Sequence, residues 1–229
     1  MPVDEFVGRA SKLKSTFTNS PKSKELINEF LGEMRQNPSE YLFDVPRLRV
    51  VPPYHFLSAG VSYAYKPHRD TWYGAPPCQI NTWMPVFSIS PDQTMHFNTA
   101  YFQTPVSNTS CDWDLKDWIE NQRSKAKSNV QKEARVHPVP TEELDTSTEM
   151  RFGGRAGDMV VFSGTHIHGT VPNKGNDIRF SVDFRVFHLK DIEAGIGAPN
   201  ADSGCKNVEY GFKDYFHAEG FAPYSEDVN

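Results

Sequence analysis

The sequence predicts a mainly β protein, a sandwich or barrel with helices packed outside the strands. Short runs rich in β-branched and aromatic residues alternate with Gly, Pro and Asn, as strands alternate with turns. Only two segments carry the apolar period of a helix. The 17 prolines lie mostly between the strand-like runs, where loop residues belong. Because β proteins of 229 residues often form one domain, we expect a single domain over residues 1–229.

Two segments are predicted to be helices. The first, Lys24–Gln36, places one apolar stripe on a helix, has Ser23 as its candidate cap, and is ended by Pro38. The stripe consists of Leu26, Ile27, Phe30, Leu31 and Met34. The second helix, Asp112–Ala134, has an apolar face over its first half only. We therefore expect a helical N-terminal part, residues 1–46, before the β core.

Six runs are predicted to be strands, and they place the core at about residues 47–188. They are Arg47–Val51, Gln79–Ile89, Met95–Gln103, Asp158–Phe162, His166–Val171 and Ile178–His188. In the last run the apolar residues from Ile178 to Val186 alternate with Arg179, Ser181, Asp183 and Arg185. Successive side chains of a strand point to opposite faces, so one face of this strand is polar. Alternation alone fits either a solvent-facing side or a polar interior. The tail, residues 189–229, is predicted to be irregular.

Composition excludes several classes of function. The net charge of −5 argues against nucleic acid or an anionic membrane surface as the main partner. No run of about 18 apolar residues predicts a membrane span, and no apolar leader opens the chain. Three widely spaced cysteines form neither a disulfide framework nor a zinc motif, which fits a reducing compartment. We expect a cytoplasmic protein.

Histidine and aspartate recur in a pattern that suggests a metal site. His68 and Asp70 stand two residues apart on an extended segment, so their side chains project the same way and can share one ion. A hydrogen-bonded pair on a loop would show the same spacing. Downstream, a strand-like run leads to His166 and His168, and since both have the same parity, alternation cannot choose between them.

The order and spacing of these motifs resemble the phytanoyl-CoA hydroxylase-like family of iron(II)/2-oxoglutarate-dependent oxygenases. The resemblance rests on His68-x-Asp70, the GDMVVF run from Gly157, His168-Gly169-Thr170, and Arg179 eleven residues after His168. It covers roughly residues 63–188. It implies a double-stranded β-helix, or jelly roll, with flanking helices. It also implies that His68, Asp70 and His168, rather than His166, bind Fe(II), and that 2-oxoglutarate and dioxygen are co-substrates.

The chemistry of these residue types supports the same assignment. Two imidazoles and one carboxylate on one face of an iron octahedron leave three positions for a chelating 2-oxo acid and dioxygen. The distal carboxylate of 2-oxoglutarate needs a fixed cation, and a guanidinium offers a bidentate contact. The spacing to His168 favours Arg179 over Arg185, and Ser181 can donate a further hydrogen bond from the same strand face. Arg185 is then free to hold a substrate carboxylate or a structural aspartate, for which Asp183 is a candidate.

Further residues are candidates for contacts in the pocket. Gln79 and Asn81 share one strand face with Trp83, and if that face points inward they can touch 2-oxoglutarate or substrate. Ordinary hydrogen bonding within the sheet is the alternative. Trp72 and Tyr73 directly follow Asp70 and are predicted to lie at the mouth of the pocket, although plain aromatic packing fits them too. Such a pocket suits a small polar or zwitterionic metabolite, such as an amino acid or a natural-product intermediate.

The resemblance implies an enzyme that oxidises a C–H bond, most often by hydroxylation, and converts 2-oxoglutarate to succinate and carbon dioxide. Asp70 occupies the position that related halogenases leave to a small residue, which points to oxygenation. Two alternatives stay open: a cupin-like metalloenzyme that does not use 2-oxoglutarate, and a jelly-roll binding module without catalysis.

Overall fold

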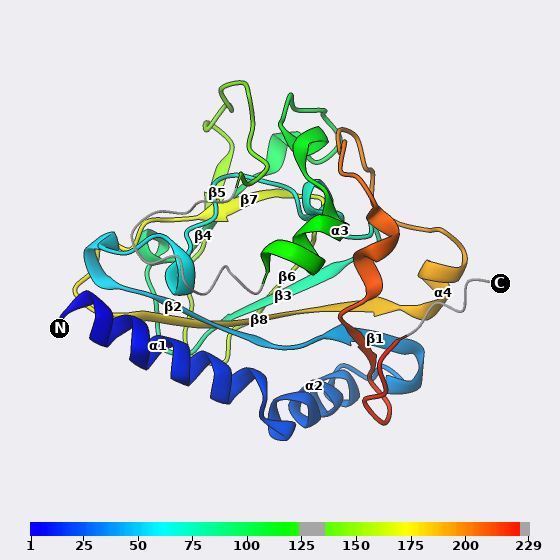
Figure 1. Cartoon of the computed structure of the whole chain (residues 1–229), viewed down its shortest axis with the longest axis horizontal. Helices are drawn as coiled ribbons and strands as arrows, with labels where there is room; N and C mark the ends of the chain where they lie inside the picture. Colours follow the sequence, from blue (N-terminus) through cyan, green and yellow to red (C-terminus); the bar gives the residue numbers. More distant parts are fainter. Residues whose placement is uncertain (124–135, 225–229) are drawn as a thin grey trace.

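Two antiparallel sheets form the centre of the molecule, a computed structural model that describes residues 1–123 and 136–224 (Figure 1). The larger sheet has the order β6-β3-β8-β1-β9, with β2 also paired to β8. Its strands are β1 (Tyr41–Asp44), β2 (Arg47–Val51), β3 (Ile80–Pro85), β6 (Val160–Ser163), β8 (Arg179–His188) and β9 (Tyr215–His217). The smaller sheet has the order β5-β4-β7, from β4 (Met95–Asn98), β5 (Glu149–Arg151) and β7 (Ile167–Thr170). This arrangement confirms the predicted mainly β jelly-roll class with flanking helices.

Helices cover the outer face of the larger sheet. Figure 1 shows α1 (Val3–Thr18) and α2 (Pro21–Glu33) running along that sheet, below it in the view. Phe6 and Ala10 of α1 pack on Leu48 and Val50 of β2, and Ile27 and Leu31 of α2 pack on Phe43, Phe184 and Val186 of β1 and β8. The remaining helices are short: α3 (Leu115–Asp117), which continues as a π-helical turn (Trp118–Gln122), and α4 (Leu189–Glu193). None of the helices in the described ranges is long and apolar enough to cross a membrane.

Several single turns of 3-10 helix connect the strands. They are η1 (Pro38–Glu40), η2 (Pro53–His55), η3 (Gly60–Ser62), η4 (Asp70–Tyr73), η5 (Pro91–Gln93), η6 (Thr99–Tyr101), η7 (Ser110–Asp112) and η10 (Val208–Phe212). The turn that matters for the site is η4, because it begins at Asp70.

A cluster of apolar side chains lies between the two sheets. Trp83 of β3 packs with Met95 and Phe97 of β4, and Phe162 of β6 joins the same cluster. Since β4 belongs to the smaller sheet and β3 and β6 to the larger one, this cluster joins the inner faces of the sheets.

The polar face of β8 is inside the molecule. Its apolar face, with Phe184 and Val186, packs against α2, so the alternate residues point toward the smaller sheet. Arg179 is 7% exposed and Ser181 is fully buried. The solvent-facing alternative for this strand is therefore wrong, and the interior of the jelly roll is charged.

The predicted elements differ from the observed ones mainly at their ends. The first predicted helix begins earlier, at Pro21 with Ser20 as its N-cap, and Leu26 and Met34 of the predicted stripe are exposed. The predicted helix Asp112–Ala134 is helical from Leu115 to Gln122, and its last part lies outside the described residues. Each predicted strand is present in shorter form, except β2, which has the predicted bounds.

The tail is better ordered than the sequence predicts. Besides α4 and η10 it contributes β9, which pairs with β1 in the larger sheet through Leu42↔His217 and Asp44↔Tyr215. The description of residues 189–229 as irregular is therefore wrong for β9. Its aromatic residues explain the pairing, because Tyr215 packs with Leu42 and Phe187 in a buried cluster.

Candidate metal centre

Three predicted ligands meet between the sheets. One ligand atom from each of His68, Asp70 and His168 lies within 4.8 Å of the other two, and all three residues are buried. The Nε2 atoms of His68 and His168 are 3.4 and 3.7 Å from Oδ1 of Asp70. Two imidazoles and a carboxylate around one point form a donor set that fits Fe(II) and other divalent transition metals.

Backbone pairing fixes the positions of these ligands. His68 and His168 form an antiparallel bridge in which each backbone N–H donates to the carbonyl of the other at 2.9 Å. The N–H of Asp70 donates to the carbonyl of Gly164 at 2.8 Å. These hydrogen bonds join the segment before η4 to β7 and the turn that leads into it. They bring Asp70 and His168, which are 98 positions apart in the sequence, to one centre.

Hydrogen bonds set the orientation of both imidazoles. Nδ1 of His68 lies 2.8 Å from the carbonyl oxygen of Lys66, and Nδ1 of His168 lies 2.8 Å from that of His166. A carbonyl only accepts, so each Nδ1 carries the proton and each Nε2 offers its lone pair toward Asp70. Burial and the nearby His68 lower the pKa of His168 to about 4, which keeps this ligand neutral near pH 7.

The two oxygens of the Asp70 carboxylate have different contacts. Its Oδ2 accepts hydrogen bonds of 2.6 Å from the side-chain amides of Gln79 and Asn81, while Oδ1 faces the imidazoles. Burial alone would raise the pKa of this carboxyl, but the neighbouring imidazoles of His68 and His168 and the charge of Arg185 outweigh it and hold the pKa well below its usual range. Gln79 and Asn81, predicted as contacts of 2-oxoglutarate or substrate, thus orient the carboxylate ligand.

His166 lies apart from this centre. Its ring stacks on Phe102 with centroids 4.3 Å apart, and it is not in the group of converging ligand atoms. Burial and the charge of Arg69 lower the pKa of His166. The geometry therefore favours His168 as the third ligand.

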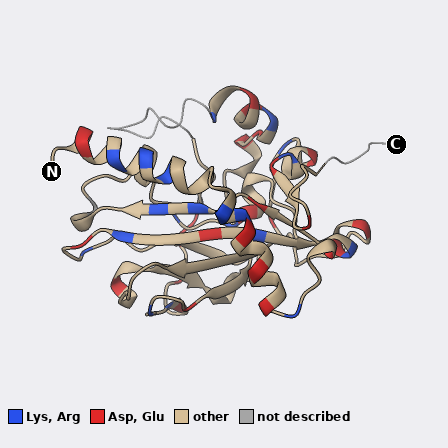
Figure 2. Cartoon of the chain, turned by 90° about the horizontal axis from the view of Figure 1, so that it is seen from below, with Lys and Arg blue, Asp and Glu red and all other residues tan. Residues whose placement is uncertain are grey.

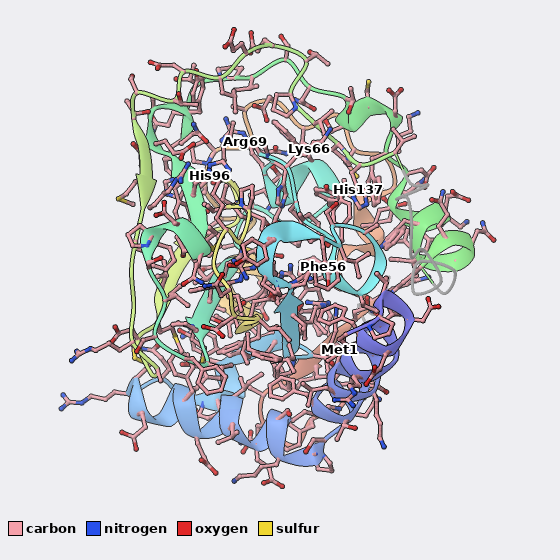
Figure 3. All side chains as sticks on the ribbon, turned by 90° about the vertical axis from the view of Figure 1, so that its left-hand side faces the viewer. Met1, Phe56, Lys66, Arg69, His96 and His137 are labelled. Atoms are coloured by element: carbon pink, nitrogen blue, oxygen red, sulfur yellow. The ribbon has the colours of Figure 1, made fainter. Side chains whose placement is uncertain are left out.

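Arg69, between the two ligands of the first motif, was not singled out by the sequence. Its side chain is fully buried and donates to the backbone carbonyls of Thr165, Tyr101 and Thr104 at 2.5, 2.6 and 2.8 Å. Figure 3 labels Arg69 together with Lys66, which precedes it by three residues in the chain. Because Thr165 precedes β7, this guanidinium ties both halves of the triad together. The position of this arginine between two candidate metal ligands is the feature of the sequence that could have indicated its role.

Arg179 and Ser181 present buried donors that lack partners among the described residues. Nη1 of Arg179 donates to the carbonyls of Gln93 and Thr94 at 3.1 and 2.8 Å, but its Nε and the hydroxyl of Ser181 make no hydrogen bond. Burial and the charge of Arg49 lower the pKa of Arg179 to about 10. Unsatisfied buried donors are costly, and a carboxylate would satisfy them.

Arg185 holds a structural aspartate, but that aspartate is Asp44, so the candidate partner Asp183 is wrong. Its Nη1 and backbone N–H donate to the carboxylate of Asp44 at 2.8 and 2.7 Å, whereas Asp183 accepts from Arg49. The cause is a break between β1 and β2: residues 45 and 46 interrupt pairing with β8, and Asp44 accepts the hydrogen bond that a strand carbonyl would otherwise receive.

The aromatic residues after Asp70 divide into two kinds. Trp72 is fully buried and its indole N–H donates to Asp202 at 2.7 Å, so its predicted place at the mouth of the pocket is wrong. Tyr73 is half-buried, with its ring 5.2 Å from that of His68. Tyr65, which the sequence did not single out, lies at the same 5.2 Å from His68, and Tyr63 stacks on His137 at 4.1 Å.

Comparison with known proteins gives likeness at the level of solved structures. No family model matches the sequence. No curated protein matches it either. A structure of EvdO2 from Micromonospora carbonacea var. aurantiaca with 2-oxoglutarate aligns over 74% of this chain and 61% of its own, with 14% identity and a TM-score of 0.47. The apo non-heme monooxygenase ThoJ aligns over 76% of this chain and 54% of its own, with 14% identity and a TM-score of 0.44. The non-heme α-ketoglutarate-dependent carbocyclase SnoK from nogalamycin biosynthesis aligns over 75% of this chain and 60% of its own, with 12% identity and a TM-score of 0.44.

The chain spans less than two thirds of the length of these three proteins. With TM-scores below 0.5, they carry no weight for function, and the resemblance to the phytanoyl-CoA hydroxylase-like family stays a prediction. Function rests instead on the residues of the site.

Proposed function

We propose that this protein is an Fe(II)/2-oxoglutarate-dependent oxygenase acting on a small organic molecule, with one catalytic domain over residues 1–229. The observation that carries the proposal is the combination of two features, one on β7 and the segment bridged to it and the other on β8. One is the buried group of His68, Asp70 and His168 with Nε2 atoms turned to one point. The other is the unsatisfied pair of donors on Arg179 and Ser181.

Each of these residues has a distinct task. His68, Asp70 and His168 would hold Fe(II), which supplies dioxygen activation coupled to conversion of 2-oxoglutarate to succinate and carbon dioxide. Arg179 and Ser181 bind the distal carboxylate of the co-substrate, and its charge offsets the cost of burying the guanidinium. Gln79 and Asn81 keep Asp70 in one orientation. The apolar cluster of Trp83, Met95 and Phe97 excludes water from one side of the site.

Hydroxylation of a C–H bond is the proposed reaction. Asp70 supports oxygenation over halogenation, since its carboxylate fills the position that a halide would need and is held there by two amides. The neutral state of His168, whose pKa is about 4, suits metal binding near pH 7.

Anaerobic titration with Fe(II) and then 2-oxoglutarate, followed by visible spectroscopy, tests the proposal. We expect a weak metal-to-ligand charge-transfer band that appears only when both are present. A cupin-like enzyme that does not use 2-oxoglutarate would bind iron without this band, and a binding module without a metal would bind neither. Either result would reject the proposal. His166→Ala is the matched control for loss of the band in His168→Ala.

A further inference from the structure

Three arginines lie on the inner face of the larger sheet beside the proposed centre and bind neither the metal nor 2-oxoglutarate in the proposed mechanism. Arg47, Arg49 and Arg185 are called here the arginine cluster. In the strand register, Arg47 stands opposite Asp183, Arg49 opposite Ser181, and Arg185 opposite Asn81. Figure 2 shows the basic residues of β2 beside the mixed basic and acidic residues of β8.

The arginine cluster has more guanidinium groups than carboxylates to balance them. Asp183 pairs with Arg49, with an Nη2–Oδ1 distance of 3.0 Å. Asp44, only 1% exposed, takes both remaining guanidiniums, Arg47 and Arg185, on its Oδ2. Within the described part of the chain, no other carboxylate forms an ion pair with these three arginines. Three cations against two anions leave one positive charge without a counter-ion.

The proposed co-substrate does not neutralise this surplus positive charge. Fe(II) with Asp70 carries one positive charge, and Arg179 adds another. The two carboxylates of 2-oxoglutarate neutralise both, so the centre with 2-oxoglutarate bound has no charge left to balance the arginine cluster. A partly buried charge without a counter-ion is unfavourable, which points to a ligand anion at this place.

The surplus charge is close to the metal ligands and can be reached. Asn81, the strand neighbour of Arg185, donates to Asp70 at 2.6 Å. Tyr65 lies between Arg49 and His68: the guanidinium carbon of Arg49 is 5.7 Å from the centre of its ring, and the ring of His68 is 5.2 Å away. The side chains of Arg47, Arg49 and Arg185 are 28%, 25% and 24% exposed, unlike the closed guanidinium of Arg69.

We propose that the substrate is an organic carboxylate whose anionic group binds the arginine cluster, while its apolar body lies against the aromatic rings of Tyr65 and Tyr73. This inference rests on the proposed oxygenase function and names its class of substrate. A cationic amine would suit the aromatic rings but would be repelled by the surplus positive charge. The ring of Tyr65 separates Arg49 from His68. The carbon that is oxidised should therefore be separated from the substrate carboxylate by about the width of one aromatic ring.

The test uses three probes of one shape and different charge: 3-phenylpropionate, 3-phenylpropionamide and 3-phenylpropylamine. Each is titrated anaerobically into the protein loaded with Fe(II) and saturating 2-oxoglutarate, so that Arg179 is already occupied, and the dissociation constant is measured by calorimetry. We expect the acid to bind at least about tenfold more tightly than the amide or the amine, as for a charge-assisted contact.

Variants of Arg47 locate the effect, because this arginine shares Asp44 with Arg185, so its loss removes the surplus charge and leaves Asp44 paired. Arg47→Gln should remove the preference for the acid while the amide binds as before, and Arg47→Lys should keep most of it. Arg155→Gln changes the net charge equally on an arginine that is 86% exposed, and should change nothing. Thermal melting confirms that each variant is folded.

The outcomes separate this inference from the proposed function. Absence of the charge-transfer band rejects the oxygenase itself. A normal band with no preference for the acid overturns the inference alone. So does an equal loss of acid and amide binding in Arg47→Gln, since that shows a change of shape rather than the loss of a counter-ion.

Discussion

The guanidinium of Arg69 donates from Nε to Oδ2 of Asp202 at 3.1 Å, which joins the residue between two candidate metal ligands to the C-terminal segment. The same carboxylate accepts from the indole of Trp72 at 2.7 Å and from the backbone N–H of Val106 at 2.9 Å. The side chain of Arg69 is 0% exposed, so its guanidinium has no contact with solvent. The tail therefore supplies the counter-ion that allows this arginine to be buried.

Asp202→Ala should destabilise the protein by about 3–5 kcal/mol, because it leaves a buried guanidinium without its counter-ion. It should also weaken Fe(II) binding, since Arg69 holds the segment of His68 and Asp70. Urea denaturation and a metal titration measure the two effects. Asp214→Ala is the matched control in the same tail: its pair with Arg123 is 39% and 43% exposed, and its loss should cost less than about 1 kcal/mol. Equal costs for both variants would contradict the role of Asp202.

His168→Ala should abolish turnover and remove most of the Fe(II) affinity, because one of three converging ligand atoms is lost. His166→Ala should leave the metal affinity within about tenfold of the wild type, since that ring stacks on Phe102 outside the centre. Iron binding measured by anaerobic titration decides between them. A dead His166→Ala with an active His168→Ala would reverse the assignment of the third ligand.

Arg179→Leu should raise the 2-oxoglutarate requirement by about 10- to 150-fold, the value of a charge-assisted hydrogen bond of about 1.5–3 kcal/mol. Fe(II) affinity without 2-oxoglutarate should hardly change, because Arg179 bonds to the carbonyls of Gln93 and Thr94 rather than to a ligand of the metal. Titration of the charge-transfer band with 2-oxoglutarate gives the measurement. An unchanged requirement would favour a metalloenzyme that does not use 2-oxoglutarate.

Local patterns in the sequence singled out residues that the structure brings together. His68 and Asp70 share one extended segment, and the alternation of Ile178–His188 placed Arg179 and Ser181 on one face. Periodicity could not tell whether that face is solvent or interior, because this depends on which side α1 and α2 cover. The partners of Arg69 and Arg185 were also out of reach. Asp202 lies 133 positions from Arg69, and Asp44 lies 141 positions from Arg185, so only the folded chain brings them together.

Acid should destabilise the metal-free protein through His168. Its folded pKa of about 4 lies below the usual value near 6.5, so the unfolded chain binds a proton that the folded chain refuses. Stability contributed by neutral His168 is therefore full above about pH 6.5, falls as the pH drops, and is lost by about pH 4, a change of roughly 3 kcal/mol. Urea denaturation of wild type and His168→Leu across this range measures it. The variant should lose less stability on acidification, and parallel pH curves would refute the assignment.

Gly164 offers a test of the carboxylate ligand that changes no polar group. A Cβ at this position would lie 2.9 Å from Nε2 of Gln79 and 3.3 Å from Oδ2 of Asp70, so Gly164→Ala must push the amide away from the carboxylate. Loss of such a supporting contact typically costs about 10- to 100-fold in metal affinity, and we expect that loss here. Gly32→Ala is the matched control, because a Cβ there meets nothing within 4 Å, and it should leave metal affinity unchanged.

A double variant decides whether the amide transmits the effect. If Gly164→Ala acts only by displacing Gln79, then adding it to Gln79→Ala should weaken Fe(II) binding no further than Gln79→Ala does alone, since the contact is already gone. Independent, additive losses would show instead that the new methyl group moves Asp70 directly, through its 3.2 Å approach to the Asp70 Cβ. In that case the backbone pairing of Asp70 with Gly164 would hold the ligand in place alongside the amide.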